Sequence, residues 1–201
     1  MSTLFNNNIF NIVIIIFIII VASKLYFNSD SFNLRCIISD VNGNKYCVRD
    51  RNKLELAADR FAHVNNNLNK LVNHLSKKYP EKENVQRLVN GYNPKKIYET
   101  LPTSEFTAYS ENKGEKLAFC LNKKKEDGTK LIDINTLTFV AIHELSHIMT
   151  TSEGHKQVFW QNFKFLLENA KEANIYQPVD YKKSPEPYCG MDITDNPLFD
   201  L

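Results

Sequence analysis

The sequence lacks the features that mark several common classes of protein. It has no excess of one charge, because 25 Lys and Arg stand against 23 Asp and Glu, and a net charge of +2 argues against a nucleic-acid partner. It has only four cysteines and no CxxC pair, which argues against a four-thiolate zinc site and a disulfide-dense mini-protein. With 201 residues, 43% hydrophobic and 24% charged, the composition excludes disorder and indicates one ordinary folded domain.

An apolar run at the N-terminus predicts a membrane segment. Residues Ile9–Ala22 are apolar with one exception, and no charged residue precedes Lys24. A cleavable signal peptide is one interpretation, but such a peptide normally carries Lys or Arg before its apolar run. We therefore expect residues 1–27 to be an uncleaved anchor in the lipid bilayer, with a transmembrane helix over about 9–27. The folded domain is expected over residues 28–201.

The residues that flank the apolar run bear on the side of the membrane at which the domain lies. Lys24 and Arg35 follow the run and only the α-amino group precedes it, so the positive-inside rule weakly favours the cytosolic side. The chain also contains no Asn-x-Ser/Thr glycosylation site, which agrees with this placement. The expected location is therefore a membrane crossed once, with the domain in the cytosol.

Two short strands are expected within Leu34–Val48, around a turn at Asn42-Gly43. A two-residue Asn-Gly loop would place Cys47 opposite Ile38 rather than opposite Cys36. The expected register thus does not favour a Cys36–Cys47 disulfide, which would also need an oxidising compartment.

Hydrophobic periodicity predicts an α+β domain. Apolar residues recur at helical spacing from about Asn52 to Lys78, and Pro80 ends the pattern, so this should be the longest helix of the domain. The other expected elements are a helix at 84–90, strands at 106–109 and 116–121, a helix at Leu137–Met149 behind N-cap residues at 133–136, a helix at 156–173, and an irregular proline-rich tail from Tyr176.

The segment from His143 to His147 carries the HExxH pattern. Histidines four residues apart on a helix lie about 40° apart around its axis, so both imidazoles can bind one metal ion. The glutamate after the first histidine points near the open coordination position, where it can take a proton from bound water. The pattern predicts Zn²⁺ as cofactor, His143 and His147 as its ligands, and Glu144 as the general base.

A catalytic zinc site needs a third protein ligand. His155 is the leading candidate, because Gly154 lets the chain turn back after the helix and bring this side chain to the metal. Glu153 and Glu168 are the alternatives.

The HELSH sequence, followed by a Gly-His pair and then Phe159-Trp160, resembles the small zinc proteases called minigluzincins, which include the WLM, SprT-like and YgjP-like groups. The resemblance implies a small mixed sheet packed on the HExxH helix, with a long backing helix. It also implies zinc ligands at His143, His147 and His155, and an aromatic seat for the third ligand. Seven residues separate His147 from His155, whereas the WLM and YgjP pattern has five.

The rest of the chain, including the sequences YCVRDR at Tyr46–Arg51 and YCGM at Tyr188–Met191, resembles uncharacterised zincin-like proteins of large DNA viruses. This resemblance implies a viral protein of a virion or host-cell membrane. In the family fold, the edge strand of the sheet holds an extended peptide. We expect Lys116–Asn122 to form that edge, although its alternation also fits an internal strand.

A peptidase of this kind also needs a hydrogen-bond donor for the oxyanion. Three tyrosines follow the third ligand, and Tyr188 is the one that we select; the alternative is that it anchors the packing of the tail.

The expectation is therefore a membrane-anchored zinc metallopeptidase that acts on a protein or peptide substrate. Two alternatives stay open. One is a non-catalytic, membrane-tethered structural or interaction protein, against which the intact HExxH argues. The other is a WLM- or SprT-like protease acting on DNA-bound proteins, against which the membrane segment and the near-neutral charge argue.

Overall fold

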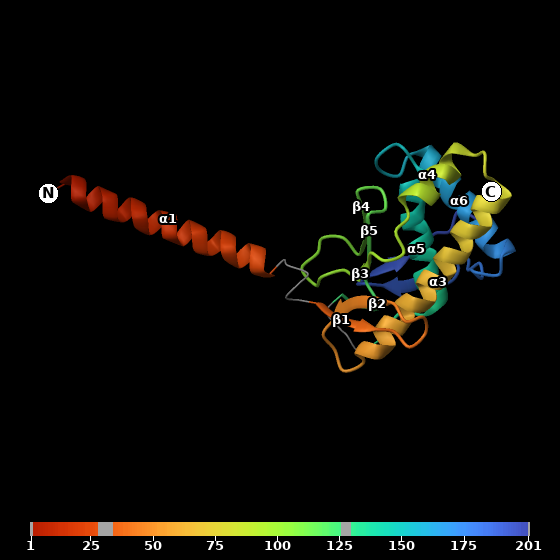
Figure 1. Ribbon diagram of the computed structural model, residues 1–201, viewed down its shortest axis with the longest axis horizontal. Coiled ribbons are helices and arrows are strands. Elements are labelled where there is room, and N and C mark those ends of the chain that lie inside the picture. Colours follow the sequence, from red (N-terminus) through yellow and green to blue (C-terminus); the bar gives the residue numbers. More distant parts are fainter. Residues whose placement is uncertain (1, 28–33, 126–129, 201) are drawn as a thin grey trace.

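The computed structural model describes residues 2–27, 34–125 and 130–200. Within these ranges the chain forms five helices, a five-stranded mixed sheet and a separate two-stranded sheet, which confirms the predicted α+β class. Helix α1 (Ser2–Phe27) extends away from the domain that the other elements form (Figure 1). The boundary between the membrane segment and the domain was expected between residues 27 and 28. Residues 28–33 lie outside the described ranges.

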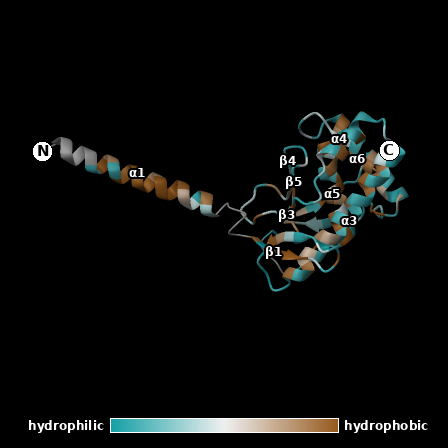
Figure 2. Ribbon diagram, viewed as in Figure 1, coloured by the Kyte–Doolittle hydropathy of each residue, from teal (hydrophilic) through white to brown (hydrophobic). Residues whose placement is uncertain are grey.

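Helix α1 holds the apolar run found in the sequence. Its segment Asn8–Tyr26 is 19 residues long, and no part of it is buried by the rest of the protein. At 1.5 Å per residue it spans roughly 28 Å, close to the ~30 Å hydrocarbon core of a bilayer. Figure 2 shows this stretch as the longest continuous hydrophobic segment of the ribbon. Its length and composition suit a membrane span or a signal sequence.

The main sheet has the strand order β1-β2-β3-β5-β4. Strands β2, β3 and β5 run parallel to one another, whereas β1 and β4 are antiparallel to their neighbours. The strands are β1 (Leu34–Ile38), β2 (Lys45–Arg49), β3 (Ile97–Glu99), β4 (Ala108–Glu111) and β5 (Lys116–Phe119).

The edge strand differs from the one expected. Strand β5 lies between β3 and β4, so the prediction that Lys116–Asn122 forms the edge is wrong, and its alternation reflects an internal strand. Strand β5 pairs with β3 on one side and with β4 on the other. The sequence analysis did not predict β3. The two edge strands are therefore β1 and β4 (Ala108–Glu111), and β4 is the one that contacts α5.

The β1–β2 hairpin also differs from its prediction. Ser39 and Asn44 close a four-residue loop, because the Ser39 N–H donates to the Asn44 carbonyl over 2.9 Å. The longer loop places Cys36 directly opposite Cys47, and the two form a disulfide. The expected two-residue loop, and the register that disfavoured this bond, are both wrong.

Four helices complete the domain: α3 (Leu54–Lys78), α4 (Glu83–Gly91), α5 (Ile134–Met149) and α6 (Gln157–Glu172). All four were predicted to within two or three residues at each end. Helix α3 contacts β1, β2 and the other three helices, and α5 contacts β4 and β5, so α3 and α5 pack side by side on the sheet. Asp133 caps α5 as expected, accepting a 2.9 Å hydrogen bond from the Thr136 N–H.

The proline-rich tail is more regular than predicted. It contains a short hairpin of β6 (Glu186–Tyr188) and β7 (Met191–Ile193). A second disulfide, between Cys120 and Cys189, ties the turn of this hairpin to the end of β5. The tail is thereby held against the sheet, beside helix α5.

Candidate metal centre

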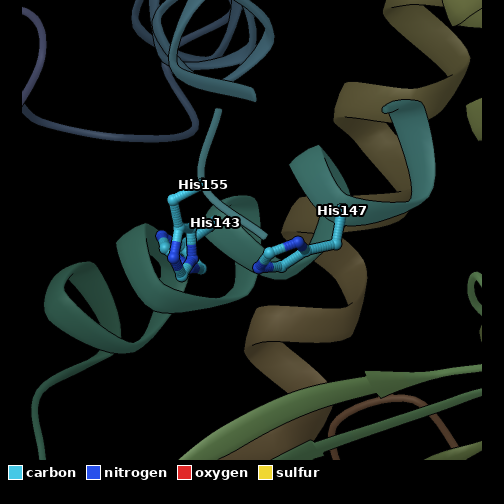
Figure 3. A group of neighbouring side chains, drawn as sticks. All are labelled: His143, His147 and His155. Atoms are coloured by element: carbon cyan, nitrogen blue, oxygen red, sulfur yellow. The ribbon is translucent and has the colours of Figure 1, made fainter. Parts of the chain in front are cut away.

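Three histidine side chains converge at the face of helix α5 (Figure 3). His143 and His147 project from α5, and His155 reaches them from the segment before α6. One nitrogen from each ring lies within 4.8 Å of the other two, and the Nε2 atoms of His143 and His155 are 3.0 Å apart. Nitrogens that bind one tetrahedral zinc ion lie roughly 3.3 Å apart. The three imidazoles therefore fit a single metal ion with small adjustments.

The turn after α5 brings His155 into place. Helix α5 ends at Met149, and Gly154 adopts φ +73°, a conformation that a residue with a side chain rarely takes. A side chain at this glycine would meet no neighbouring atom, so the conformation alone accounts for the glycine. Asn162 on α6 donates a 2.8 Å hydrogen bond to the Thr150 hydroxyl and fixes the start of the turn.

Neither alternative third ligand belongs to this cluster, although Glu153 lines the same cavity as the histidines. Glu153 is paired with Lys113 at 3.1 Å, and Glu168 is exposed on α6. Of the predicted candidates, the structure brings His155 to the two histidines of α5.

A fully buried phenylalanine forms the floor of the histidine cluster. The ring centroid of Phe159 lies 4.5 to 4.8 Å from those of all three histidines. Trp160 stacks obliquely on His155 at 5.9 Å. The two aromatic residues thus lie where the resemblance implied, and they limit the rotation of the imidazoles.

The surroundings keep the imidazoles of His143 and His147 uncharged at neutral pH. Burial, together with the neighbouring His147 and His155, lowers the pKa of His143 to about 3. Burial, together with the neighbouring His155 and Lys113, lowers the pKa of His147 to about 4. A neutral imidazole offers a nitrogen lone pair, which is the form that binds a metal ion.

Glu144 lies beside the histidines and is 4% exposed. Burial alone raises the pKa of its carboxyl group to about 8. In the part of the chain that the structure describes, this carboxyl group has no hydrogen-bond or ion-pair partner. An unpaired buried carboxyl at a cavity wall is free to exchange a proton with a molecule bound there.

Two cavities meet at the cluster. The first, which we call the polar cavity, has a volume of about 570 Å³ and is walled by β4, the β4–β5 turn and the loop before α6. The second, the apolar pocket, has a volume of about 390 Å³ and lies between α5, α6 and β7. Both are lined by Ala108, His143, Glu144 and His155. The histidine cluster therefore stands between two differently lined spaces.

Tyr188, the predicted oxyanion donor, lines the apolar pocket with its hydroxyl group engaged elsewhere. The hydroxyl donates to the Thr107 carbonyl at 3.0 Å and accepts from the Cys120 N–H at 3.2 Å. Its only proton is thus used within the sheet, and burial raises the pKa of the phenol. This arrangement supports a positioning role, in which Tyr188 joins β6 to the strand ends beside the site. Its catalytic role stays a prediction.

The sequence analysis missed the walls of the polar cavity. Lys113, in the β4–β5 turn, donates to the Thr150 carbonyl at 3.2 Å and pairs with Glu153 across the cavity. Nothing in the local sequence linked the β4–β5 turn with the loop before α6, because only the tertiary fold brings them together.

Comparison with known proteins identifies viral relatives. No family model matches the chain, and no solved structure matches it significantly. It is 28% identical to an uncharacterised protein of Acanthamoeba polyphaga mimivirus over 98% of this chain and the whole of that protein. It is 32% identical over 75 residues, 37% of this chain, to an uncharacterised protein of Invertebrate iridescent virus 6, and spans 41% of that relative. The predicted similarity to viral proteins is confirmed.

Proposed function

We propose that this protein is a zinc-dependent metallopeptidase with a minigluzincin-like domain. The observation that carries the proposal is the convergence of His143, His147 and His155 on one point, with the buried Glu144 beside them. Three imidazoles are a common donor set for catalytic zinc, and they leave a fourth position open. The open cavities on both sides of the cluster provide access to that position.

Zinc at this site would supply Lewis acidity and lower the pKa of bound water. Glu144 is then the proton carrier of the reaction. The positive charge of a nearby metal ion favours its ionised form, so its pKa falls from the raised value of the metal-free protein. As a carboxylate it accepts the proton of the attacking water, and it returns this proton to the leaving nitrogen of the peptide.

The substrate in this proposal is an extended peptide that pairs with β4. This strand is one of the two edges of the sheet, and its residues Ala108 to Ser110 line the polar cavity beside the histidines, which no residue of the other edge strand, β1, does. An extended chain added to an exposed strand edge gains main-chain hydrogen bonds regardless of its sequence. The peptide-binding edge is therefore assigned to β4 in place of Lys116–Asn122.

Replacing one carboxyl group tests the proposal. The full chain in detergent micelles is loaded with zinc and incubated with a mixed peptide library, beside its Glu144→Gln variant. We expect one zinc ion per chain in both proteins, and a loss of cleavage of at least ~100-fold in the variant. Cleavage at the parent rate by the variant, or a parent that binds no zinc, would overturn the proposal.

The two disulfides bear on where the protein works. From the length and exposure of its apolar segment we infer that α1 is a membrane anchor. Because disulfides persist in oxidising compartments, we infer that the domain lies on the oxidising side of that membrane. This differs from the cytosolic side that the flanking charges favour. Protease added to intact cells that express the full chain should then degrade the domain. Protection of the domain until the membrane is permeabilised would contradict this placement.

A further inference from the structure

The apolar pocket differs sharply from the polar cavity on the other side of the histidine cluster. Its walls are largely aromatic or aliphatic side chains from three elements, and they lead directly to the metal-binding nitrogens. Those side chains are Phe139, Val140, Trp160, Phe163, Met191 and Ile193. The polar cavity instead contains the Lys113–Glu153 ion pair and the Ser110 hydroxyl, which is buried without a hydrogen-bond partner.

The exposure of the pocket walls shows that the pocket can accept a ligand. Trp160 is 42% exposed and Met191 is 52% exposed, whereas Phe139 and Phe163, at the base, are at most 5% exposed. Exposed Trp and Met side chains above a buried aromatic base gain free energy when an apolar group covers them. A pocket of about 390 Å³ lies within the size range of small-molecule sites, ~300–1,000 Å³.

The rim of the pocket carries negative charge. Asp192 and Asp195 both line it, and Asp195 shares Lys182, at 3.2 Å, with Asp200. Asp192 on β7 is exposed, and it has no ion-pair partner among the residues described. An acidic side chain entering the pocket would meet this charge and lose its hydration. The rim thus disfavours Asp and Glu in a bound peptide.

We propose that the apolar pocket selects the peptide to be cleaved, by taking a large uncharged apolar side chain next to the scissile bond. The proposal rests on the proposed peptidase function and adds its specificity. A peptide lying along β4 crosses the residues that both cavities share, so a side chain beside the reacting carbonyl reaches the apolar pocket. Residues further along the peptide lie in the polar cavity.

Hydroxamates test the pocket without requiring turnover. These compounds chelate zinc, and the side chain that they carry can be varied. The probes carry a benzyl, isobutyl, methyl or carboxyethyl group, and calorimetry measures their affinity for the zinc-loaded full chain in micelles. We expect the benzyl and isobutyl probes to bind at least about tenfold more tightly than the methyl probe, and the carboxyethyl probe to bind most weakly.

Variants connect this preference with the pocket. Met191→Ala should reduce the preference for the benzyl probe, and Asp192→Lys should raise the affinity of the carboxyethyl probe. Leu56→Ala is the matched control: Leu56 is 43% exposed on α3 and lines neither cavity, so the order of affinities should not change.

The outcomes separate the two proposals. Zinc binding with equal affinity for all four probes, or with no binding of any probe, would overturn the pocket proposal and leave the peptidase proposal standing. A chain that binds no zinc would overturn both. Selective probe binding without cleavage of any library peptide would refute the peptidase proposal and leave an apolar-selective ligand site.

Discussion

The ring of Phe159 stands nearly perpendicular to the imidazole of His155, with the ring centroids 4.6 Å apart. The same phenyl ring contacts the other two histidines of the cluster. One side chain on α6 therefore orients ligands that come from α5 and from the loop before α6. The packing of α5 against α6 is coupled in this way to the geometry of the metal site.

Phe159→Ala should weaken both the fold and the metal site. Deleting a fully buried phenyl ring costs about 3–5 kcal/mol of stability, and the cavity left behind lets the imidazoles rotate. We expect a lower urea midpoint and a zinc affinity reduced by at least about tenfold in the protein that stays folded. Phe159→Leu leaves a smaller cavity, so it should show the same effects more weakly. It keeps the prediction testable if Phe159→Ala does not fold.

The control for this prediction is Phe61→Ala. Phe61 is equally buried, but it packs against Tyr46 and Phe119 and lines neither cavity beside the histidines. Its loss should lower stability by a similar amount and leave the zinc affinity of the folded fraction unchanged. Equal losses of zinc affinity in the two variants would show that Phe159 acts only through stability.

The histidine cluster could be predicted because its members are close in sequence. The spacing of His143 and His147 on one helix follows from helical geometry, and Gly154 marks the turn that returns His155. The same holds for the helices, whose apolar residues recur at helical spacing. Each of these predictions uses residues that lie within one short, continuous segment of the chain.

The sheet could not be predicted in the same way. Strand β3 has only three residues, Ile97–Glu99, and its place between β2 and β5 depends on partners far away in the chain. The buried Glu99 receives a hydrogen bond from the Arg49 N–H and an ion pair from Arg51, contacts that no local pattern indicates. Because β3 was missing from the prediction, Lys116–Asn122 was wrongly assigned to the edge of the sheet. The error was therefore one of long-range strand pairing.

A second prediction concerns the β4–β5 turn, which carries Lys113. Gly114 has φ +107°, and a side-chain carbon there would lie 2.4 Å from the Gly91 carbonyl oxygen. Gly114→Ala should therefore destabilise the protein by about 3 kcal/mol, as measured by urea unfolding. Gly43→Ala is the matched control, because Gly43 has φ +70° in open space, and it should cost only about 1 kcal/mol. If both variants lost the same amount of unfolding free energy, the backbone at Gly91 and Gly114 would have moved apart to make room for the new side chain.

The third prediction is a pH dependence of the metal-free protein. Glu144 has its pKa raised from 4.5 to about 8 by burial. Below pH 4.5 the carboxyl group is neutral in both the folded and the unfolded state. As the pH rises from 4.5 to about 8, the unfolded chain loses this proton and the folded chain keeps it, so stability falls, by up to about 5 kcal/mol.

The comparison that isolates this effect uses Glu144→Gln. The buried histidines titrate alike in both proteins, so the difference in unfolding free energy between variant and parent reports on Glu144. This difference should grow in favour of the variant between pH 5 and pH 8 in the presence of a chelator. Parallel stability curves over that range would mean that the carboxyl group is not desolvated as the structure indicates.

The fourth prediction distinguishes the two disulfides. Cys120–Cys189 closes a loop with a sequence separation of 69, and Cys36–Cys47 one of 11, so loop entropy assigns them about 4 and 3 kcal/mol respectively. Both paired alanine variants should be less stable than the parent. Only the loss of Cys120–Cys189 should also reduce the selectivity of the apolar pocket for the benzyl hydroxamate, because this bond holds the β6–β7 hairpin that carries Met191 and Asp192. The variant that lacks the Cys36–Cys47 disulfide is the control, because neither cysteine lines the pocket. If this variant lost as much selectivity, selectivity would depend on global stability and not on the position of the β6–β7 hairpin.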